Sequence, residues 1–303
     1  EEGATPVVFD IQLGGGRKPS VFMAPGEARW DGVDFGPIQA VHIRCTAPNT
    51  LPAVPPRMNA ASYAEWRSPY LREQEYQATT FSFFNHLIHM GKLVVNPLTV
   101  GYIDHDSKGQ LYMRLRAAGF PVPETLTTND PNRAAAFLQQ CGELVVKPAI
   151  GVGSTRLLTH EDLGFLDEIA LCPVLLQQRI KGHTLRVHVV ADTVVLALRI
   201  YSDGGVDSRT ATKHFEYITF PEEEAARLTA ATRMLGLHYA AWDVLEGEDG
   251  RLFYLDCNPG PFVMWIGPQF VQVVFRQLAR YLITYARTGS IQESSKAVSP
   301  WRP

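Results

Sequence analysis

Asp256 and Asn258 stand two residues apart in the apolar stretch LFYLDCN, which covers residues 252–258. Side chains at positions i and i+2 of a strand point to the same face of a sheet, so we expect both to share a face with Tyr254, while Cys257 points the other way. Mg²⁺ prefers oxygen donors and takes only one or two carboxylates from a protein. The spacing therefore predicts a magnesium site, although acidic residues also end many strands that bind no metal.

Asp243 lies in an earlier apolar stretch, and the turn sequence GEDG at residues 247–250 separates it from Asp256. Two strands joined by such a turn form a hairpin. We expect the hairpin to bring Asp243 close to Asp256 and Asn258, so that three oxygen donors lie on neighbouring strands.

Lys108 is predicted to begin a helix, because Asp106 and Ser107 just before it are both residue types that cap helix N-termini. A cation at that position opposes the helix dipole by up to about 1 kcal/mol, so a negative group is expected nearby. The alternative to a functional anion is a surface ion pair with Asp104 or Asp106.

Lys147 ends the apolar strand sequence ELVVK, and Pro148 stops the strand from continuing. Gly151 and Gly153 follow, and glycines let successive backbone N–H groups turn inward to form an anion-binding loop. A lysine beside such a loop adds a charge suited to phosphate. The segment lacks the GxxxxGK[ST] pattern of the P-loop, so an ordinary flexible loop is the alternative.

Arg186 and Arg199 fall on two alternating strands around a predicted two-residue turn at 191–192. In that register Arg186 opposes Ala197 and Arg199 opposes Thr184, which places both arginines on one face. Two neighbouring guanidinium groups need anions, and a polyphosphate or an acyl phosphate fits that need. Pairing with protein carboxylates is the alternative.

Composition limits the classes of protein to consider. The chain has 303 residues, 46% hydrophobic and 19% charged, with a net charge of −3. That charge argues against a nucleic-acid or membrane-surface role driven by overall charge, and no apolar run reaches the length of a membrane span. The four cysteines are scattered without metal-type spacing, which favours a reducing cytoplasm.

The chain is predicted to form an N-terminal α/β domain over residues 1–100, a central lobe over 101–175, a C-terminal lobe over 176–290 and a tail over 291–303. In the first domain we expect strands at 6–11, 38–44 and 92–97 and a helix around 70–90. Further helices are expected from Lys108 to Gly119, whose glycine suits a left-handed end, and at 221–235 and 268–287. The ends, 1–5 and 290–303, are expected to be loose tails.

The order of these motifs resembles the ATP-grasp superfamily, and within it the ribosomal-protein glutamate ligase branch and the microviridin-type graspetide synthetases. The resemblance covers about residues 92–267, and its segments are VVNPLTVGYIDHDSKGQLYMRLRAAGFPVPETLTTNDP, VVKP with the glycine-rich loop, LLQQRIKG, LRVHVV and WDVLEGEDGRLFYLDCNPGPFVMWI. It implies an α+β fold of three domains, with the nucleotide between the central and C-terminal lobes. ATP and Mg²⁺ are the implied cofactors.

The resemblance also implies roles for individual residues. Arg186 and Arg199 are expected at the γ-phosphate and the acyl phosphate, and Asp243, Asp256 and Asn258 are expected to hold Mg²⁺. The residues expected to contact the nucleotide are Lys108, Lys147, Gly151, Gly153, Ser154, Gln177, Gln178, Arg179 and Ile180. Relatives often carry an acidic residue for ribose where this chain has Thr184, so His183 or Gln178 would have to serve instead.

The implied activity is an ATP-dependent ligase that joins a carboxylate to an amine or a hydroxyl through an acyl phosphate. The expected substrate is a peptide, with a precursor peptide and its leader as partner, and the product is a modified or macrocyclic peptide. One alternative is a ligase of free amino acids or of a small-molecule scaffold. Another is a nucleotide-binding pseudo-enzyme. A homo-oligomer is consistent with the resemblance.

Overall fold

The computed structural model describes residues 3–11, 19–44, 59–98, 107–148, 155–159, 161, 164, 166–202 and 213–302. The chain divides into two compact units, which are described separately below. Unit 1 comprises Glu1–Leu98 and Ala279–Ala297, and unit 2 comprises Thr99–Leu278 and Val298–Pro303. The finer division into three domains and a tail stays a prediction.

Unit 1 has a small core of aromatic side chains. Trp30 and Phe35 both pack edge-on against Phe83, with ring centroids 4.9 and 5.1 Å apart, and all three side chains are fully buried. The elements of the unit are β1 (Val21–Ala24), β2 (Glu27–Trp30), β3 (Val33–Asp34), β4 (Ala40–His42), α1 (Ala60–His89), β5 (Leu93–Val95), the end of α7 (Pro268–Thr288) and α8 (Ile291–Lys296). The first three strands form an antiparallel sheet, and β4 pairs in parallel with β5.

Helix α1 is longer than the sequence predicts. Asn59 caps it, accepting hydrogen bonds from Ala61 and Ser62, and Pro69 lies inside it. The expected start near residue 70 is therefore wrong, because the helix begins at Ala60 and continues through Pro69. Its buried side chains all lie in its last third, so only that end is held by the core.

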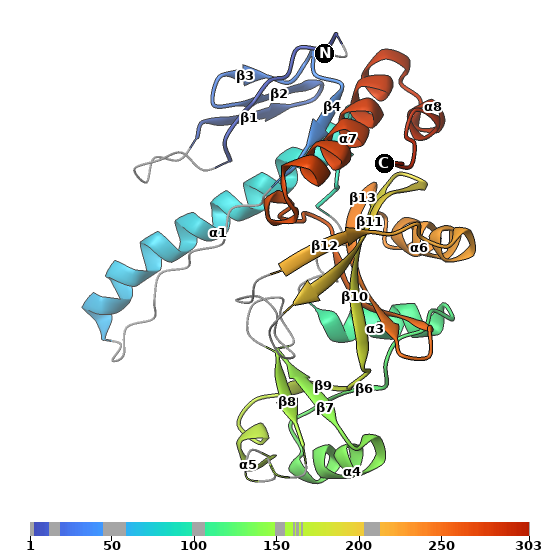
Figure 1. The fold of residues 1–303 in the computed structure, drawn as a ribbon. Helices are drawn as coiled ribbons and strands as arrows, with labels where there is room; N and C mark the ends of the chain where they lie inside the picture. The colour runs from blue at the N-terminus through green and yellow to red at the C-terminus, as the bar shows by residue number, and fades with distance from the viewer. Residues whose placement is uncertain are drawn as a thin grey trace. The chain divides into compact units, whose positions relative to one another are not determined.

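The first sheet of unit 2 has four strands in the order β6-β9-β7-β8, with helices on one side (Figure 1). Its elements are β6 (Thr125–Thr128), α4 (Pro131–Cys141), β7 (Leu144–Lys147), β8 (Arg156–Leu158), α5 (Leu166–Ile169) and β9 (Val174–Gln178). Leu138 of α4 and Ile169 of α5 pack on Leu144 and Leu176 of the strands. Strands β7 and β9 pair antiparallel, with Lys147 opposite Leu175 and Gln177 opposite Val145, so Lys147 and Gln177 are diagonal neighbours on adjacent strands.

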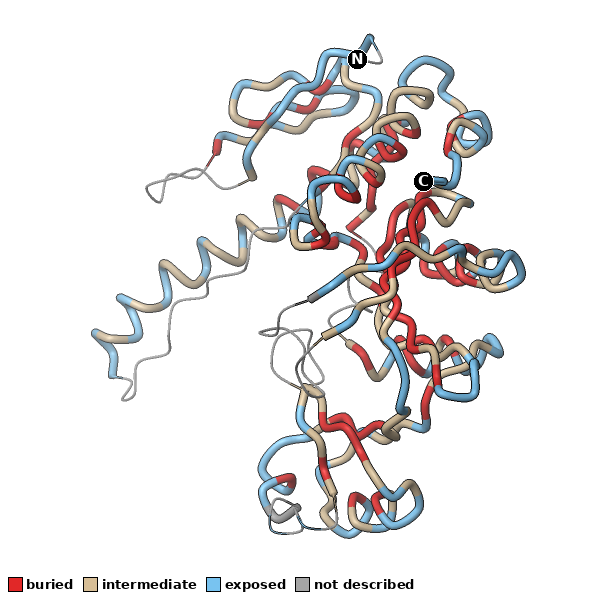
Figure 2. Tube along the Cα trace, in the orientation of Figure 1, coloured by how far each residue is buried: buried red, intermediate tan, exposed pale blue. Residues whose placement is uncertain are grey.

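The second sheet of unit 2 has five strands in the order β12-β11-β10-β13-β14. Its strands are β10 (Gly182–Val190), β11 (Thr193–Ser202), β12 (Lys213–Tyr217), β13 (Tyr239–Gly247) and β14 (Leu252–Asn258), and the helices that pack on it are α3 (Lys108–Ala117) and α6 (Glu222–Met234). Leu111 of α3 and Leu228 of α6 pack on one face of this sheet against Val187 and Trp242. Figure 2 shows that buried residues concentrate along this sheet.

Several local predictions are confirmed. The predicted helices at 108–118 and 221–235 appear as α3 and α6, and the one at 268–287 as α7 (Pro268–Thr288). Gly119 follows α3 with φ of 79°, the left-handed end expected of it. Among the helices that the structure describes, none combines the length and the apolar character needed to cross a bilayer.

Two predictions for the ends of the chain are wrong. The stretch at 6–11 forms no strand, and Val8 there is 88% exposed, because its apolar residues find no neighbouring strand. The C-terminal segment expected to be loose contains α8, and beyond it the Trp301 backbone N–H donates to the Val195 carbonyl at 3.0 Å. The Trp301 ring also meets Tyr217 edge-on at 4.9 Å, so aromatic packing anchors this segment.

Candidate active site

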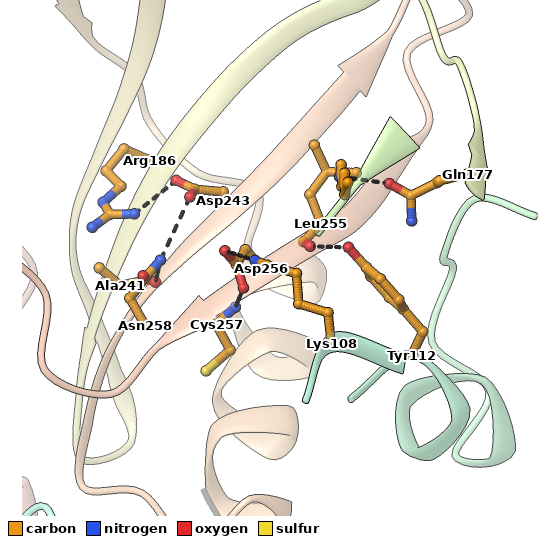
Figure 3. Close-up of polar contacts among 11 residues, drawn as sticks. Lys108, Tyr112, Gln177, Arg186, Ala241, Asp243, Leu255, Asp256, Cys257 and Asn258 are labelled. Carbon is orange, nitrogen blue, oxygen red and sulfur yellow. Dashed lines mark hydrogen bonds and ion pairs between the residues drawn. The ribbon is translucent and has the colours of Figure 1, made fainter. Parts of the chain in front are cut away.

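The β13–β14 hairpin brings together the three predicted oxygen donors. Asp243 pairs directly with Asp256, and Asn258 pairs with Ala241. The Asn258 Nδ2 donates to Asp243 Oδ2 at 3.5 Å and to the Ala241 carbonyl at 3.3 Å (Figure 3). The prediction that the hairpin places these side chains close together is confirmed.

The same hairpin corrects the prediction for Tyr254. The pairing shifts by one residue after Asp243, so that Val244 opposes Tyr254 and Leu255 is the extra residue of a bulge. As a result Tyr254 packs in the core with Cys257 instead of sharing a face with Asp256. Strict alternation along the strand was wrong at this point.

Lys108 approaches the carboxylates from α3. Its Nζ forms an ion pair with Asp256 Oδ2, and its side chain is only 11% exposed. Leu111 in the core and Tyr112, whose hydroxyl donates to the Leu255 carbonyl at 2.5 Å, fix α3 against β14. The negative group expected near Lys108 is therefore Asp256.

The predicted cap of α3 is only partly observed. Ser107 occupies the N-cap position but makes no capping hydrogen bond through its side chain. Asp104 and Asp106, the alternative partners of Lys108, lie outside the described residues.

Lys147, at the end of β7, reaches the same cluster from the four-stranded sheet. Its Nζ donates to Gln177 Oε1 at 2.7 Å, and Gln177 Nε2 donates to Thr125 Oγ1 at 3.1 Å. Burial lowers the pKa of Lys147 to about 8; the Lys108 charge adds to this, and Asp256 and Asp243 oppose it. The sequence did not predict that Gln177 holds the lysine, because the two residues are 30 positions apart.

The segment after β9 connects the two sheets. The Gln178 backbone N–H donates to the Glu124 carbonyl at 2.8 Å, and the Arg179 N–H donates to the Glu143 carbonyl at 3.1 Å. Arg179 also pairs with the Glu143 carboxylate at 3.3 Å. The expected contact of Gln178, Arg179 and Ile180 with adenine stays a prediction, and Gly151, Gly153 and Ser154 lie outside the described residues.

Arg186 borders the carboxylates at the end away from Lys108 (Figure 3). Its Nη1 donates to Asp243 Oδ1 at 2.8 Å, and its side chain is 6% exposed. The guanidinium carbon lies over the ring of Trp265, 5.6 Å from the centroid. Trp265 was not predicted as a site residue, and the only sequence signal was its place in the segment that follows Asn258.

Arg199 is not on the same face as Arg186, so that prediction is wrong. The β10–β11 pairing shifts by one residue between His188 and Val189, so that Arg199 opposes Leu185. Arg199 consequently lies on the α6 side of the sheet, where Glu246 accepts from its Nη2 at 2.7 Å. It lines a cavity of about 480 Å³ there, together with Glu224 and Arg227. The bulge overturned the predicted register.

The resulting cluster suits a phosphate group and a divalent cation. Two carboxylates and a carboxamide converge with three cationic side chains, so the local charge is positive and favours an anion. The described residues contain no group of three or more His, Cys, Asp or Glu side chains placed to hold a metal. Two carboxylates and one amide oxygen nevertheless match what Mg²⁺ takes from proteins when phosphate oxygens and water complete its shell.

Comparison with known proteins gives a family match and several relatives. Residues 105–209 match a family model described as an ATP-grasp domain. The tetrahydromethanopterin:alpha-L-glutamate ligase of Methanocaldococcus jannaschii is 27% identical over 207 residues, which make up 63% of this chain and 68% of that protein.

Solved structures agree with this match. The ATP-grasp ligase PsnB complexed with minimal precursor has a TM-score of 0.73 and 28% identity, covering 88% of this chain and 85% of PsnB. PsnB complexed with minimal precursor, Mg and ADP has a TM-score of 0.72 and 27% identity, covering 87% of this chain and 83% of PsnB. The macrocyclase MdnC bound with precursor peptide MdnA, from Microcystis aeruginosa, shares the fold with a TM-score of 0.65 at 19% identity, covering 88% and 85%. The chain has the predicted α+β ATP-grasp fold.

Proposed function

We propose that this chain, which carries an ATP-grasp domain at residues 105–209, is an ATP-dependent ligase that joins a carboxylate to an amine or hydroxyl on a peptide substrate. The observation that carries the proposal is the convergence of Asp243, Asp256 and Asn258 with Lys108, Lys147 and Arg186. The relative PsnB supports it, because its structures contain a precursor, and two of them also contain Mg and ADP.

The proposed roles follow from charge and position. Lys108 and Lys147 would bind phosphate oxygens of ATP, since each is a point charge held near the carboxylates by a fixed partner. Asp243, Asp256 and Asn258 would hold Mg²⁺. When bound, the metal neutralises charge on the phosphate oxygens. Arg186, beside Asp243, would face the phosphoryl group that is transferred.

The proposed reaction has two steps. An oxygen of the substrate carboxylate attacks the γ-phosphorus, the bond to the β-phosphate oxygen breaks, and ADP leaves. The amine or hydroxyl then attacks the acyl carbon, loses a proton and displaces phosphate, which forms the amide or ester bond. Arg186 would orient the reacting phosphoryl group while the lysines hold the phosphates that leave with ADP, and water must be kept from the acyl phosphate.

A second candidate is a ligase that adds free amino acids to a small-molecule scaffold. The glutamate ligase of Methanocaldococcus jannaschii, 27% identical, favours this candidate. Both candidates use the same side-chain cluster and differ in the molecules that supply the carboxylate and the amine or hydroxyl. A cytoplasmic location fits either one, because Cys141, Cys172 and Cys257 are free thiols.

Intact-mass spectrometry can test the proposal. The protein is incubated with ATP, Mg²⁺ and either small peptides encoded beside its gene or free amino acids with candidate scaffolds. Loss of water within one peptide supports macrocyclisation, whereas a gain in mass by one amino-acid residue supports the second candidate. Asp256→Asn should abolish either product while the protein stays folded. ATP binding without any ATP-dependent product would favour the pseudo-enzyme and overturn the proposal.

A further inference from the structure

Arg186 is an almost fully buried cation with few fixed partners. It is 5% exposed, and Asp243 is its one carboxylate partner among the described residues. Its Nε is buried and makes no hydrogen bond within that part of the chain. A buried guanidinium with unused donors is costly unless an anion completes its contacts. One hydrogen bond to a carboxylate that would also serve a metal does not fix the plane of the group.

The Trp265 ring supplies a second restraint on that plane. The Arg186 Cζ lies over this ring at 5.6 Å, within the range of a cation–π contact. Phe215 of β12 packs on Trp265, with ring centroids 5.2 Å apart, so the indole is held from the sheet. Arginine stacks well on aromatic faces because its guanidinium is planar and weakly hydrated.

The residues beside Arg186 on its own strand add no competing anion. His188, two positions along β10, is fully buried, and burial lowers its pKa well below the usual value, so it is neutral. Its ring stacks on Tyr239, with centroids 6.3 Å apart. Among the residues that the structure describes, Asp243 is therefore the one carboxylate that pairs with the Arg186 guanidinium.

We propose that Trp265 is a positioning residue that holds the Arg186 guanidinium toward the terminal phosphate of the nucleotide, so that the protein prefers a triphosphate to a diphosphate. The inference rests on the proposed role of Arg186 at the γ-phosphate. Lys108 lies at the end of the carboxylates away from Arg186 (Figure 3), and in the proposed function Lys108 and Lys147 bind phosphates that ATP and ADP share. Trp265 should therefore affect the affinity for ATP, which has the terminal phosphate, and leave the affinity for ADP nearly unchanged.

Calorimetric titration of the full chain with ADP and with AMPPNP, both with Mg²⁺, can test this. The variants are Trp265→Tyr, Trp265→Phe and Trp265→Leu, and thermal unfolding checks that each is folded. Cation–π attraction weakens from tryptophan through tyrosine and phenylalanine to leucine, which has no ring. We expect Trp265→Leu to bind AMPPNP about tenfold more weakly, with ADP affinity within about twofold of wild type, and the two aromatic variants to lie between.

The outcomes separate this inference from the role given to Arg186. Arg186→Gln should remove the same preference for AMPPNP. If it does and the Trp265 series leaves the preference unchanged, the inference about Trp265 is wrong. An equal loss of affinity for ADP and AMPPNP across the Trp265 variants would show that Trp265 has only a structural role, and would also overturn the inference. If Arg186→Gln keeps the preference, the proposed role of Arg186 itself fails. Should Trp265→Leu not fold, the order of the two aromatic variants still decides.

Discussion

We expect Lys147 to take up a proton when the protein binds a nucleotide. Burial holds the pKa of this lysine at about 8 in the free protein, with Lys108 adding to the effect. A phosphate placed beside Lys147 favours its charged form and returns its pKa toward the ordinary value of about 10.4. Binding is therefore linked to protonation, and nucleotide affinity falls as pH rises through the pKa of the free lysine.

The size of the effect follows from the two pKa values. At pH 8.5 the free lysine is about 24% protonated and the bound one about 99%, so that about 0.75 proton is taken up per nucleotide. At pH 7 the free lysine is already about 90% protonated, and the uptake is only about 0.1 proton. Affinity should fall about tenfold between pH 7 and pH 9.

Calorimetry with ADP and Mg²⁺ in buffers of different ionisation enthalpy measures this uptake directly. The phosphates of ADP are ionised at pH 8.5, because the second pKa of a phosphate is about 6, and they contribute little. Lys147→Arg is the matched control: arginine stays charged at this pH, so binding should persist without proton uptake. Uptake that persists in Lys147→Arg, or that is close to zero in the wild type at pH 8.5, would refute the reasoning.

Three further predictions concern other residues. Asp256→Asn keeps the side-chain shape but removes a charge from the proposed metal site, so the Mg²⁺ concentration needed for ADP binding should rise at least about tenfold in a titration. Thr232→Val removes the acceptor of the Trp242 Nε1 hydrogen bond, 2.8 Å long between two fully buried side chains, and should lower the free energy of unfolding by about 1–3 kcal/mol in urea. Thr229→Val is its control, since that hydroxyl only donates within its own helix, and should cost clearly less. Arg199→Lys should leave AMPPNP affinity within about twofold, because Arg199 lies on the α6 side of the sheet; a large loss would contradict that placement.

The parts of the fold that depend on local pattern could be predicted from the sequence. The apolar stripe of α7 and the turn before Leu252 gave a helix and a hairpin close to the observed ones. That Asp243 lies near Asp256 was expected from the hairpin, since a short turn brings its two strands together. The register of the turn alone would set Leu255 opposite Asp243, and the bulge is what puts Asp256 there. Local sequence therefore predicted that the two carboxylates of the candidate site lie close together.

Contacts between distant segments could not be predicted in the same way. The hydrogen bond from Lys147 to Gln177 depends on β7 lying beside β9, and the contact of Arg186 with Trp265 depends on how the chain returns over the sheet after Asn258. Neither has a spacing signal, because residue types and periodicity report on one element at a time.

Two bulges in the five-stranded sheet decide which face Arg199 and Tyr254 point to. Each adds one residue to a strand: Val195 is the extra residue of β11, opposite the step from His188 to Val189, and Leu255 is the extra residue of β14, opposite the step from Asp243 to Val244. Because the side-chain period of a strand is two, one extra residue reverses every later side chain relative to the partner strand. The first bulge sends Arg199 to the α6 side, and the second turns Tyr254 into the core while Asp256 still faces Asp243. Tyr254 and Asp256 are two positions apart, and strict alternation would put them on the same face. The bulge lets Tyr254 point into the core while Asp256 points to the opposite face.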